Sequence, residues 1–278
     1  MPERQLIVNA DDYGLTPGVS RGIAEAMTRG IVTSTSVLVN MPGWQDAVAR
    51  LHDVPARSSI GLHLNLVAGR PLTDAASLVD RRTGHFHTLP RFLLLAAGGR
   101  LDQDEIAMEC GAQLERLRAT GVRVTHADSH RHVHVLPIVA DAIAPVLDGL
   151  PLRHPVESLP GSRPPLRGVV KRWLIAGAMG VRLGASPRNA RADHFVGISL
   201  QGSARFAARL ARLVDQLPAG TTELMVHPGY VDDALPSVDD FVAMREEELL
   251  SLTSLALRQR LQDREIALVA GRAARPAA

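Results

Sequence analysis

The sequence predicts an α/β fold, specifically a TIM-like (β/α) barrel that is distorted or has fewer than eight strands. Short apolar runs alternate with helical patterns over most of the 278 residues, and the runs are nearly continuous, as in parallel strands covered on both faces. Polar residues follow several different strands, which is typical of barrels. A doubly wound sheet is the alternative. However, no Gly-x-Gly-x-x-Gly follows the first strand and no Walker-type loop is present, so a nucleotide crevice has little support.

The first half of the chain contains four expected strand–helix units. The helix at 17–29 has the clearest ends, because Thr16 can cap it, Pro17 suits its first position and Gly30 stops it. Apolar and β-branched runs favour strands, and apolar residues at helical spacing favour helices. We therefore expect strands at 6–8, 32–39, 60–66 and 122–125, followed in turn by helices at 17–29, 44–51, 104–118 and 138–147.

The second half continues the alternation, and two long segments interrupt it. The expected order is a strand at 194–200, a helix at 204–217, a strand at 223–227, a helix at 239–257 and a strand at 266–269. Segments 68–100 and 158–192 are long for connections, so we interpret them as insertions in a single domain (1–278) that shape a site entrance. Each contains an apolar stretch, at 92–97 and 173–181. Extra helices that cover the core are an equally good interpretation.

Composition excludes several classes of protein. The net charge is only +2, from 31 basic and 29 acidic residues, and 3% of residues are aromatic, which argues against a nucleic-acid partner. The single cysteine, Cys110, cannot form an intramolecular disulfide and suits a reducing compartment. A strand begins within a few residues of the N-terminus and no apolar run reaches the ~20 residues of a membrane span. We expect a soluble cytoplasmic protein; peripheral contact with the inner membrane and a homodimer are both compatible with the sequence.

Two neighbouring carboxylates, Asp11 and Asp12, leave the end of the first apolar strand. Neighbours on a strand point in opposite directions, so one can hold a metal ion while the other stands beside it. A helix cap or a turn explains the pair equally well when it is taken alone.

Histidines supply the rest of a candidate metal site. His63 lies between leucines in the third strand, where a core histidine is the ordinary interpretation. Asp128, His130, His132 and His134 are spaced by two and would point to one side if the stretch is extended. Four such groups on one face are hard to explain as packing, because each buried one needs a partner. The spacing leaves open which of the three histidines binds. Carboxylates and imidazoles together predict a divalent-metal site of the kind used by metal-assisted hydrolases.

A further histidine, His227, follows the strand at 223–227 and precedes Pro228 and Gly229. Barrels place catalytic groups at such strand ends, and imidazole is a natural general acid near neutral pH. A structural histidine bonded to its own loop is the alternative. His85 and His87 lie near a polar turn and are interpreted as surface or loop residues.

Four motifs together resemble the YdjC family, also called the chitooligosaccharide deacetylase family. They are LIVNADDYG at 6–14, GLHLN at 61–65, THADSHRHVH at 125–134 and VHPG at 226–229, and the resemblance runs from about residue 5 to about residue 268. It implies a TIM-like barrel related to the polysaccharide deacetylases and hydrolysis of an acetamide on a sugar. Carried over by position, it implies the following roles: Asp12, His63 and His130 as metal ligands, Asp11 as general base, and His227 as the acid that protonates the leaving amine.

A finer resemblance is to the hopanoid-associated deacetylases, which act on N-acetylglucosamine attached to a hopanoid lipid. It rests on ADHFVG at 192–197, GTTELM at 220–225 and the turn TGHF at 83–86. Zinc is the favoured ion, with magnesium or another first-row ion as alternatives, and His132 or His134 either orients the site or replaces His130. The alternative functions are deacetylation of soluble chitooligosaccharides, a metal-dependent sugar isomerase or phosphoesterase, and a non-catalytic carbohydrate-binding protein.

Overall fold

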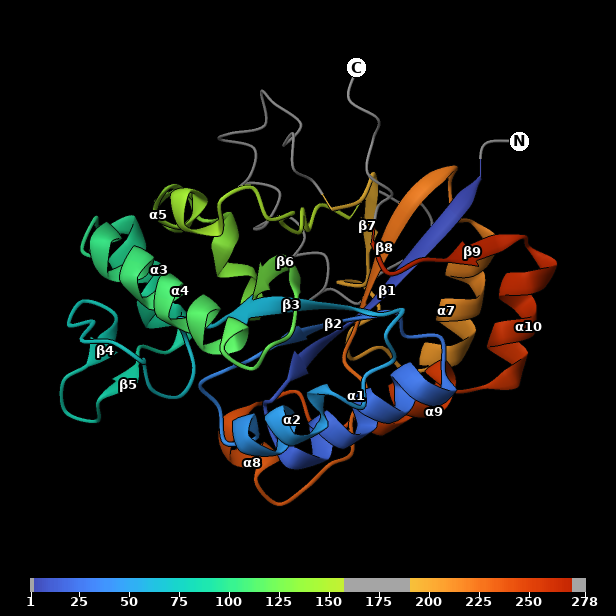
Figure 1. Ribbon diagram of the computed structural model, residues 1–278, viewed down its shortest axis with the longest axis horizontal. Coiled ribbons are helices and arrows are strands. Elements are labelled where there is room, and N and C mark those ends of the chain that lie inside the picture. The colour runs from blue at the N-terminus through green and yellow to red at the C-terminus, as the bar shows by residue number, and fades with distance from the viewer. Residues whose placement is uncertain (1–2, 158–190, 272–278) are drawn as a thin grey trace.

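β1 (Arg4–Tyr13) is the central strand of a curled, wholly parallel sheet (Figure 1). The computed structural model describes residues 3–157 and 191–271. Within them the sheet order is β6-β3-β2-β1-β8-β7, and β9 pairs with the first half of β1. The other strands are β2 (Ser34–Val37), β3 (Ser59–Leu64), β6 (Val124–Ser129), β7 (His194–Val196), β8 (Gly220–Val226) and β9 (Ile266–Leu268).

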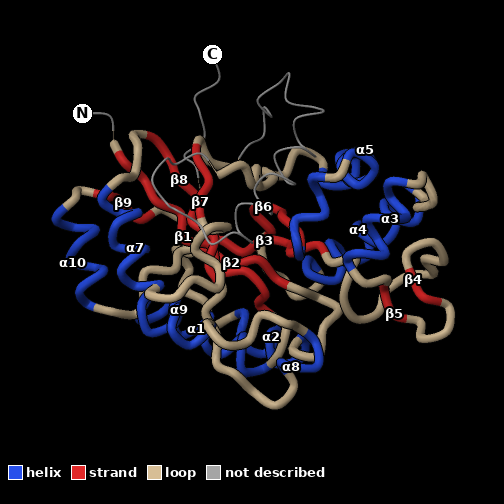
Figure 2. The backbone as a smooth tube through the Cα atoms, turned by 180° about the vertical axis from the view of Figure 1, so that it is seen from behind, coloured by secondary structure: helices blue, strands red, loops and turns tan. Residues whose placement is uncertain are grey.

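Helices surround the outer side of this sheet, so that the strands form the interior of the molecule (Figure 2). A short antiparallel hairpin, β4 (Val79–Asp80) and β5 (His85–Phe86), lies apart from the sheet. The helices are α1 (Pro17–Arg29), α2 (Trp44–Leu51), α3 (Leu89–Ala97), α4 (Gln103–Arg118), α5 (Pro137–Leu147), α7 (Phe206–Asp215), α8 (Leu235–Val238), α9 (Arg245–Leu252) and α10 (Leu255–Asp263), with a 3-10 segment η1 (His130–Val135).

The two edges of the sheet, β6 and β7, are connected through a single stretch of chain. Leu152 forms an isolated parallel bridge with Ala127 of β6, and Glu157 forms one with Phe195 of β7. The stretch between them therefore lies across the gap that an open sheet would leave. The predicted α/β class with a parallel sheet is confirmed, and the curled half-barrel fits a distorted TIM-like barrel.

The first helix, α1, lies where the sequence predicts it, and its ends have the expected caps. The Thr16 hydroxyl accepts a hydrogen bond from the Val19 N–H at 3.3 Å, and the Gly30 N–H donates to Ala26 O, so both ends are capped as expected. The buried face of α1, which includes Ile23, packs into the main core. Burial of one such aliphatic side chain contributes about 1.5–3 kcal/mol.

The single helix expected at 239–257 is wrong. The chain is irregular over 239–244, α9 ends at Leu252, and α10 begins after Ser254. The Ser254 hydroxyl accepts a hydrogen bond from the Leu257 N–H at 3.2 Å, which starts a new helix instead of continuing the old one. Serine and threonine side chains compete in this way for backbone hydrogen bonds. The spacing of apolar residues gives no sign of this competition.

The two predicted insertions have different outcomes. Segment 68–100 forms the β4–β5 hairpin and α3, whose Phe92 and Leu95 are buried. Segment 158–192, with its apolar stretch at 173–181, lies outside the described residues except for 191 and 192. Cys110 is fully buried in α4.

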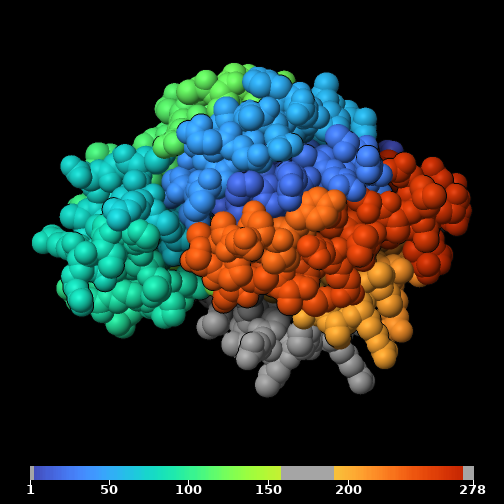
Figure 3. Space-filling model, turned by 90° about the horizontal axis from the view of Figure 1, so that it is seen from below, coloured from blue at the N-terminus to red at the C-terminus, as the bar shows by residue number. Residues whose placement is uncertain are grey.

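The loop after β8 packs tightly on α1, and this contact positions one side of the site. Seen from below, the segments between about residues 230 and 250 lie beside α1 and α2 (Figure 3). A Cβ atom at Gly22 would lie 2.6 Å from the Gly229 Cα, so the close approach requires glycine. The Gly18 N–H also donates to the Asp232 carboxylate at 2.6 Å.

Candidate active site

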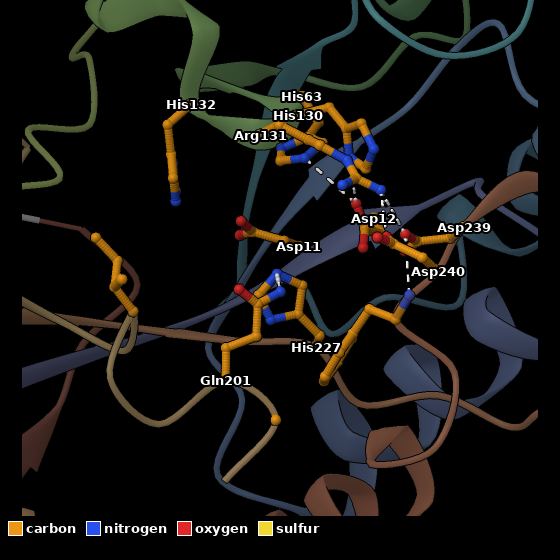
Figure 4. A pocket seen from close by; sticks show the side chains of 13 residues that line it. Asp11, Asp12, His63, His130, Arg131, His132, Gln201, His227, Asp239 and Asp240 are labelled. Carbon is orange, nitrogen blue, oxygen red and sulfur yellow. Dashed lines mark hydrogen bonds and ion pairs between the residues drawn. The ribbon is translucent and has the colours of Figure 1, made fainter. Parts of the chain in front are cut away.

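A cavity of about 460 Å³ brings together all five residues for which the sequence predicts site roles (Figure 4). They come from the ends of four different elements, as expected for a barrel-like α/β fold. In this view His63 and His130 lie on one side of Asp11, and His227 lies on the other. The lining also includes residues without a predicted role: Arg131, Ile198, Gln201, Asp239, Asp240 and Phe241.

Asp11 and Asp12 both line this cavity, although strand alternation predicts that neighbours point apart. Asp12 has a positive φ of 74°, and the pairing of β1 with β2 shifts register between Ala10 and Tyr13. A left-handed residue at such an irregularity redirects its side chain. The expectation of opposite directions is therefore wrong, and the cause is a local backbone feature.

Asp12, His63 and His130 form a group that can hold a metal ion. Asp12 Oδ1 lies 3.3 Å from His63 Nε2 and 3.1 Å from His130 Nδ1. The Nε2 atom of His130 is buried and has no hydrogen-bond partner within the described part of the chain. Three ligand atoms of mixed oxygen and nitrogen type therefore converge in a buried position.

The charges around His63 favour a cation there. Burial by itself would lower the pKa of His63, but the charge of Asp128 and hydrogen bonds with Asp12 and Asp128 raise it to about 10. His63 Nδ1 lies 2.6 Å from Asp128 Oδ1, which directs Nε2 toward Asp12. A carboxylate on the second ring nitrogen is the usual support of a metal-binding histidine.

Asp11, His63 and Asp128 form a second group with metal-ligand geometry, but an arginine fills it. Arg153 Nη1 and Nη2 donate to the two oxygens of Asp11 at 2.6 and 2.7 Å, and Nη2 also lies 2.8 Å from Asp128 Oδ2. Arg153 Nε donates to Glu223 at 2.9 Å. Since a guanidinium already neutralises these carboxylates, the second group is a poor place for a metal ion.

The histidine-rich stretch is not extended, which corrects the expectation of one common direction. It folds into η1, where Arg131 and His132 are left-handed with φ of 57° and 58°. His130 reaches Asp12, whereas His132 packs edge-on against Phe195. Two consecutive left-handed residues are rare outside glycine, so period-two spacing could not predict this turn.

His134 turns away from the cavity and supports Arg153 instead. Its Nε2 lies 3.1 Å from the Arg153 carbonyl oxygen, and its Nδ1 lies 2.5 Å from the Ser129 hydroxyl. Burial lowers the pKa of His134 to about 4, so the ring is neutral near pH 7. The Nε2–H of His134 then donates to the Arg153 carbonyl oxygen and fixes the backbone of Arg153, whose side chain holds Asp11.

His227 lies just after β8 and lines the cavity opposite the histidine pair. Its backbone N–H donates to Glu248 Oε2 at 2.6 Å, and its ring packs edge-on against Phe241. Gln201 Nε2 lies 3.4 Å from His227 Nε2. Burial raises the pKa of Glu248 to about 8, so the Glu248 carboxyl group is protonated and neutral at pH values below 8.

The sequence does not predict three residues that support the site: Arg153, Arg245 and Glu248. Arg245 Nη2 donates to Asp12 Oδ2 at 2.7 Å. Burial would raise the pKa of Asp12, but Arg245 and hydrogen bonds from His130 and His63 hold it well below its usual range. None of the three belongs to a local motif, and Arg245 and Glu248 lie in a run of charged residues at 245–248 that resembles an ordinary solvated helix face. By contrast, His85 and His87 do not line the cavity. His85 is an exposed residue of strand β5 and not of a loop, and His87 follows that strand.

Comparison with known proteins assigns the chain to a family. The model for YdjC-like proteins matches residues 5–263. The chain belongs to the YdjC-like family. Relatives named carbohydrate deacetylase include one from Geobacillus stearothermophilus, 35% identical over 96% of this chain and 96% of its own, and one from Homo sapiens, 36% identical over 82% and 76%. The predicted enzyme class is borne out by these relatives, since deacetylation of an acetamide hydrolyses an amide C–N bond.

A solved structure supports the same relationship. A protein of Enterococcus faecalis V583, named as a candidate for cellobiose-phosphate cleavage, superposes with a TM-score of 0.76 at 25% identity and covers 96% of this chain and 97% of its own. Its fold is therefore shared over nearly the whole length. Within the described residues, every helix is too short or too polar to cross a membrane.

Proposed function

We propose that this YdjC-like protein is a metal-dependent carbohydrate N-deacetylase that converts an N-acetylglucosamine-type sugar into the free amine and acetate. The observation that carries the proposal is the convergence of Asp12, His63 and His130 beside Asp11 in one cavity. The names of the relatives supply the reaction class, and the site supplies the groups that such a reaction needs.

The donor set fits a divalent ion of the first transition row. One carboxylate oxygen and two imidazole nitrogens leave positions open, as in catalytic sites, and nitrogen donors suit zinc better than magnesium. The approach of His130 Nδ1 to Asp12 Oδ1 and the cation-favouring charges around His63 support this fit. A bound ion would supply Lewis-acid chemistry, lowering the pKa of the attacking water and stabilising charge on the carbonyl oxygen.

Asp11 is the proposed general base. Oδ1 already accepts from Arg153 and from Asn9, whereas Oδ2 accepts from Arg153 Nη1 and keeps a lone pair for a proton. The bidentate clamp fixes the direction of that lone pair, and a fixed direction is what a base needs in order to act on a bound water. Asp11 therefore takes the proton of the attacking water.

His227 is the proposed general acid. It lines the cavity on the far side of Asp11 from His63 and His130, so a sugar acetamide between them would present its nitrogen to the ring (Figure 4). The hydrogen bond from its backbone to Glu248 and the contact with Phe241 hold the ring at the end of β8. The protonated imidazole gives its proton to the departing nitrogen, and the amine leaves neutral.

We further propose that the sugar carries a hopanoid-type apolar aglycone. The sequence resemblance to hopanoid-associated deacetylases supports this choice. The insertion at 68–100 follows β3, the strand that carries His63, and its helix α3 exposes Leu93 and Leu94, which are apolar side chains available to a lipid tail. Burial of apolar surface on such a tail would add affinity without changing the chemistry.

Acetate release from defined N-acetylglucosaminyl substrates tests the proposal. We expect release by the metal-loaded protein, loss after removal of metal with a chelator, and recovery when zinc is restored. A lipid-linked substrate should give a lower KM than a soluble chitooligosaccharide with a similar kcat. Turnover that a chelator does not affect, or absence of release from every acetylated sugar, would contradict the proposed function; equal KM values would contradict only the aglycone.

A further inference from the structure

The two oxygens of the Asp12 carboxylate have different partners. Oδ1 lies 3.3 Å from His63 Nε2 and 3.1 Å from His130 Nδ1, on the side of the proposed metal site. Oδ2 accepts a hydrogen bond from Arg245 Nη2 at 2.7 Å. Only one of the two oxygens is therefore directed at the histidines, and the other is held by a guanidinium.

The same nitrogen of Arg245 also contacts a second carboxylate. Nη2 donates to Asp239 Oδ2 at 2.6 Å, so it lies between Asp12 and Asp239. Two carboxylates around one point are an arrangement that a divalent cation can occupy. Arg245 thus occupies the place that a cation bound by both acids would take.

Arg245 is rigidly held in this position. Its side chain is fully buried, its Nε donates to the Phe241 carbonyl oxygen at 2.8 Å, and its guanidinium carbon lies 5.3 Å from the centre of the Phe241 ring. If this buried arginine moved aside, Asp12 Oδ2 and Asp239 Oδ2 would both lose the guanidinium that they share, which is costly in the interior.

We propose that Arg245 sets the metal specificity of the site by restricting Asp12 to one ligand oxygen and by excluding an oxygen-preferring cation from the space between Asp12 and Asp239. The inference rests on the proposed function, because it concerns the ion held by Asp12, His63 and His130. One oxygen and two nitrogens suit zinc and its neighbours. Calcium needs six to eight oxygens and readily accepts a bidentate carboxylate. Asp12 cannot bind it in that way while Arg245 holds Oδ2.

Metal affinity, measured without any turnover, tests this assignment. Calorimetric titration of the metal-stripped protein gives the dissociation constants of zinc and of calcium for the wild type and for Arg245→Met. We expect the ratio of zinc affinity to calcium affinity to fall by about 10- to 100-fold in the variant, the range seen when groups that orient metal ligands are changed. In the double variant Arg245→Met/Asp239→Asn, the gain in calcium affinity should shrink because one carboxylate is lost.

Matched variants separate specificity from simple support of the fold. Arg245→Lys keeps a positive charge between the two acids and should stay close to the wild-type ratio, as should Arg260→Met, which removes a partly exposed ion pair with Asp215. If Arg245→Met does not fold, Arg245→Gln removes the charge and keeps an amide donor, with the same expected shift.

The outcomes are distinct. Equal weakening of both ions, or an unchanged ratio, in the uncharged variants would overturn the role of Arg245 while leaving the metal site intact. Absence of zinc binding by the wild type would overturn the proposed function itself.

Discussion

Two neighbouring groups of aspartate and histidine differ in how an arginine meets them. In the deeper group, Arg153 binds both oxygens of Asp11 and also reaches Asp128, so the guanidinium takes the central position. In the group at the cavity, Arg245 binds only one oxygen of Asp12 and leaves the other facing His63 and His130. Both groups consist of aspartate and histidine, but the guanidinium lies at the centre of the first group and at one side of the second.

This difference shows why ligand-type residues alone do not define a metal site. His63 belongs to both groups, with Nδ1 toward Asp128 and Nε2 toward Asp12. Arginine keeps its charge at any accessible pH, so a carboxylate that it clamps on both oxygens is satisfied and oriented instead of being available to a metal. Arginine placement thereby supports the proposed roles, in which Asp11 is the base and Asp12 is the metal ligand.

The largest expected effect follows from removal of the shared residue. His63→Ala takes one nitrogen from the proposed ligand set, so we expect zinc affinity to fall by more than the roughly 100-fold upper value for groups that only orient ligands, and turnover to reach background. Metal content of the purified variant, determined together with its circular dichroism spectrum, is the measurement. Wild-type metal content in a folded variant would show that the ion binds elsewhere.

The next effect comes from the arginine of the deeper group. Arg153→Met removes the guanidinium that Asp11, Asp128 and Glu223 share, and Asp11 loses its bidentate partner; loss of one partner from a buried ion pair costs about 3–5 kcal/mol. Chemical unfolding should show this loss in the free energy of unfolding. The matched change Arg260→Met, in a partly exposed pair, should cost far less, because water and salt screen such a pair. Equal costs at the two positions would remove the contrast between the groups.

A smaller, pH-dependent effect comes from His134, which supports the backbone of Arg153. Burial lowers its pKa to about 4 from the ordinary 6.5, so the unfolded chain takes up the proton first. This contribution to stability is complete above pH 6.5 and is lost as the pH falls to about 4, by roughly 3 kcal/mol. Unfolding free energies at pH 7 and pH 4 should therefore differ less in His134→Gln than in the wild type. The same difference in both proteins would show that His134 titrates normally.

Much of the fold could be predicted from local patterns. Thr16, Pro17 and Gly30 mark both ends of α1, and continuous apolar runs mark the parallel strands. The break between α9 and α10 at Ser254 could not be seen, because a capping hydroxyl leaves the apolar spacing unchanged. Apolar periodicity thus locates elements better than it locates their ends.

The site could be predicted only in part, for a related reason. Side chains at strand ends, such as His63 and His227, follow from the pattern of the sheet. The positive φ of Asp12 and the turn of η1 could not be predicted in this way, since residues other than glycine rarely adopt a left-handed backbone conformation. Arg153 lies 142 residues from Asp11 in the chain, so only the fold reveals that they meet.

The division of roles between Asp11 and Asp12 is tested most directly by exchanging each carboxylate for the isosteric amide. The measurement is zinc stoichiometry together with acetate release for Asp11→Asn and Asp12→Asn. We expect Asp11→Asn to keep about the wild-type metal content and to lose turnover by roughly 10²- to 10⁴-fold, the usual contribution of a general base. Asp12→Asn should lose the metal. Loss of metal in Asp11→Asn with retention in Asp12→Asn would contradict the account.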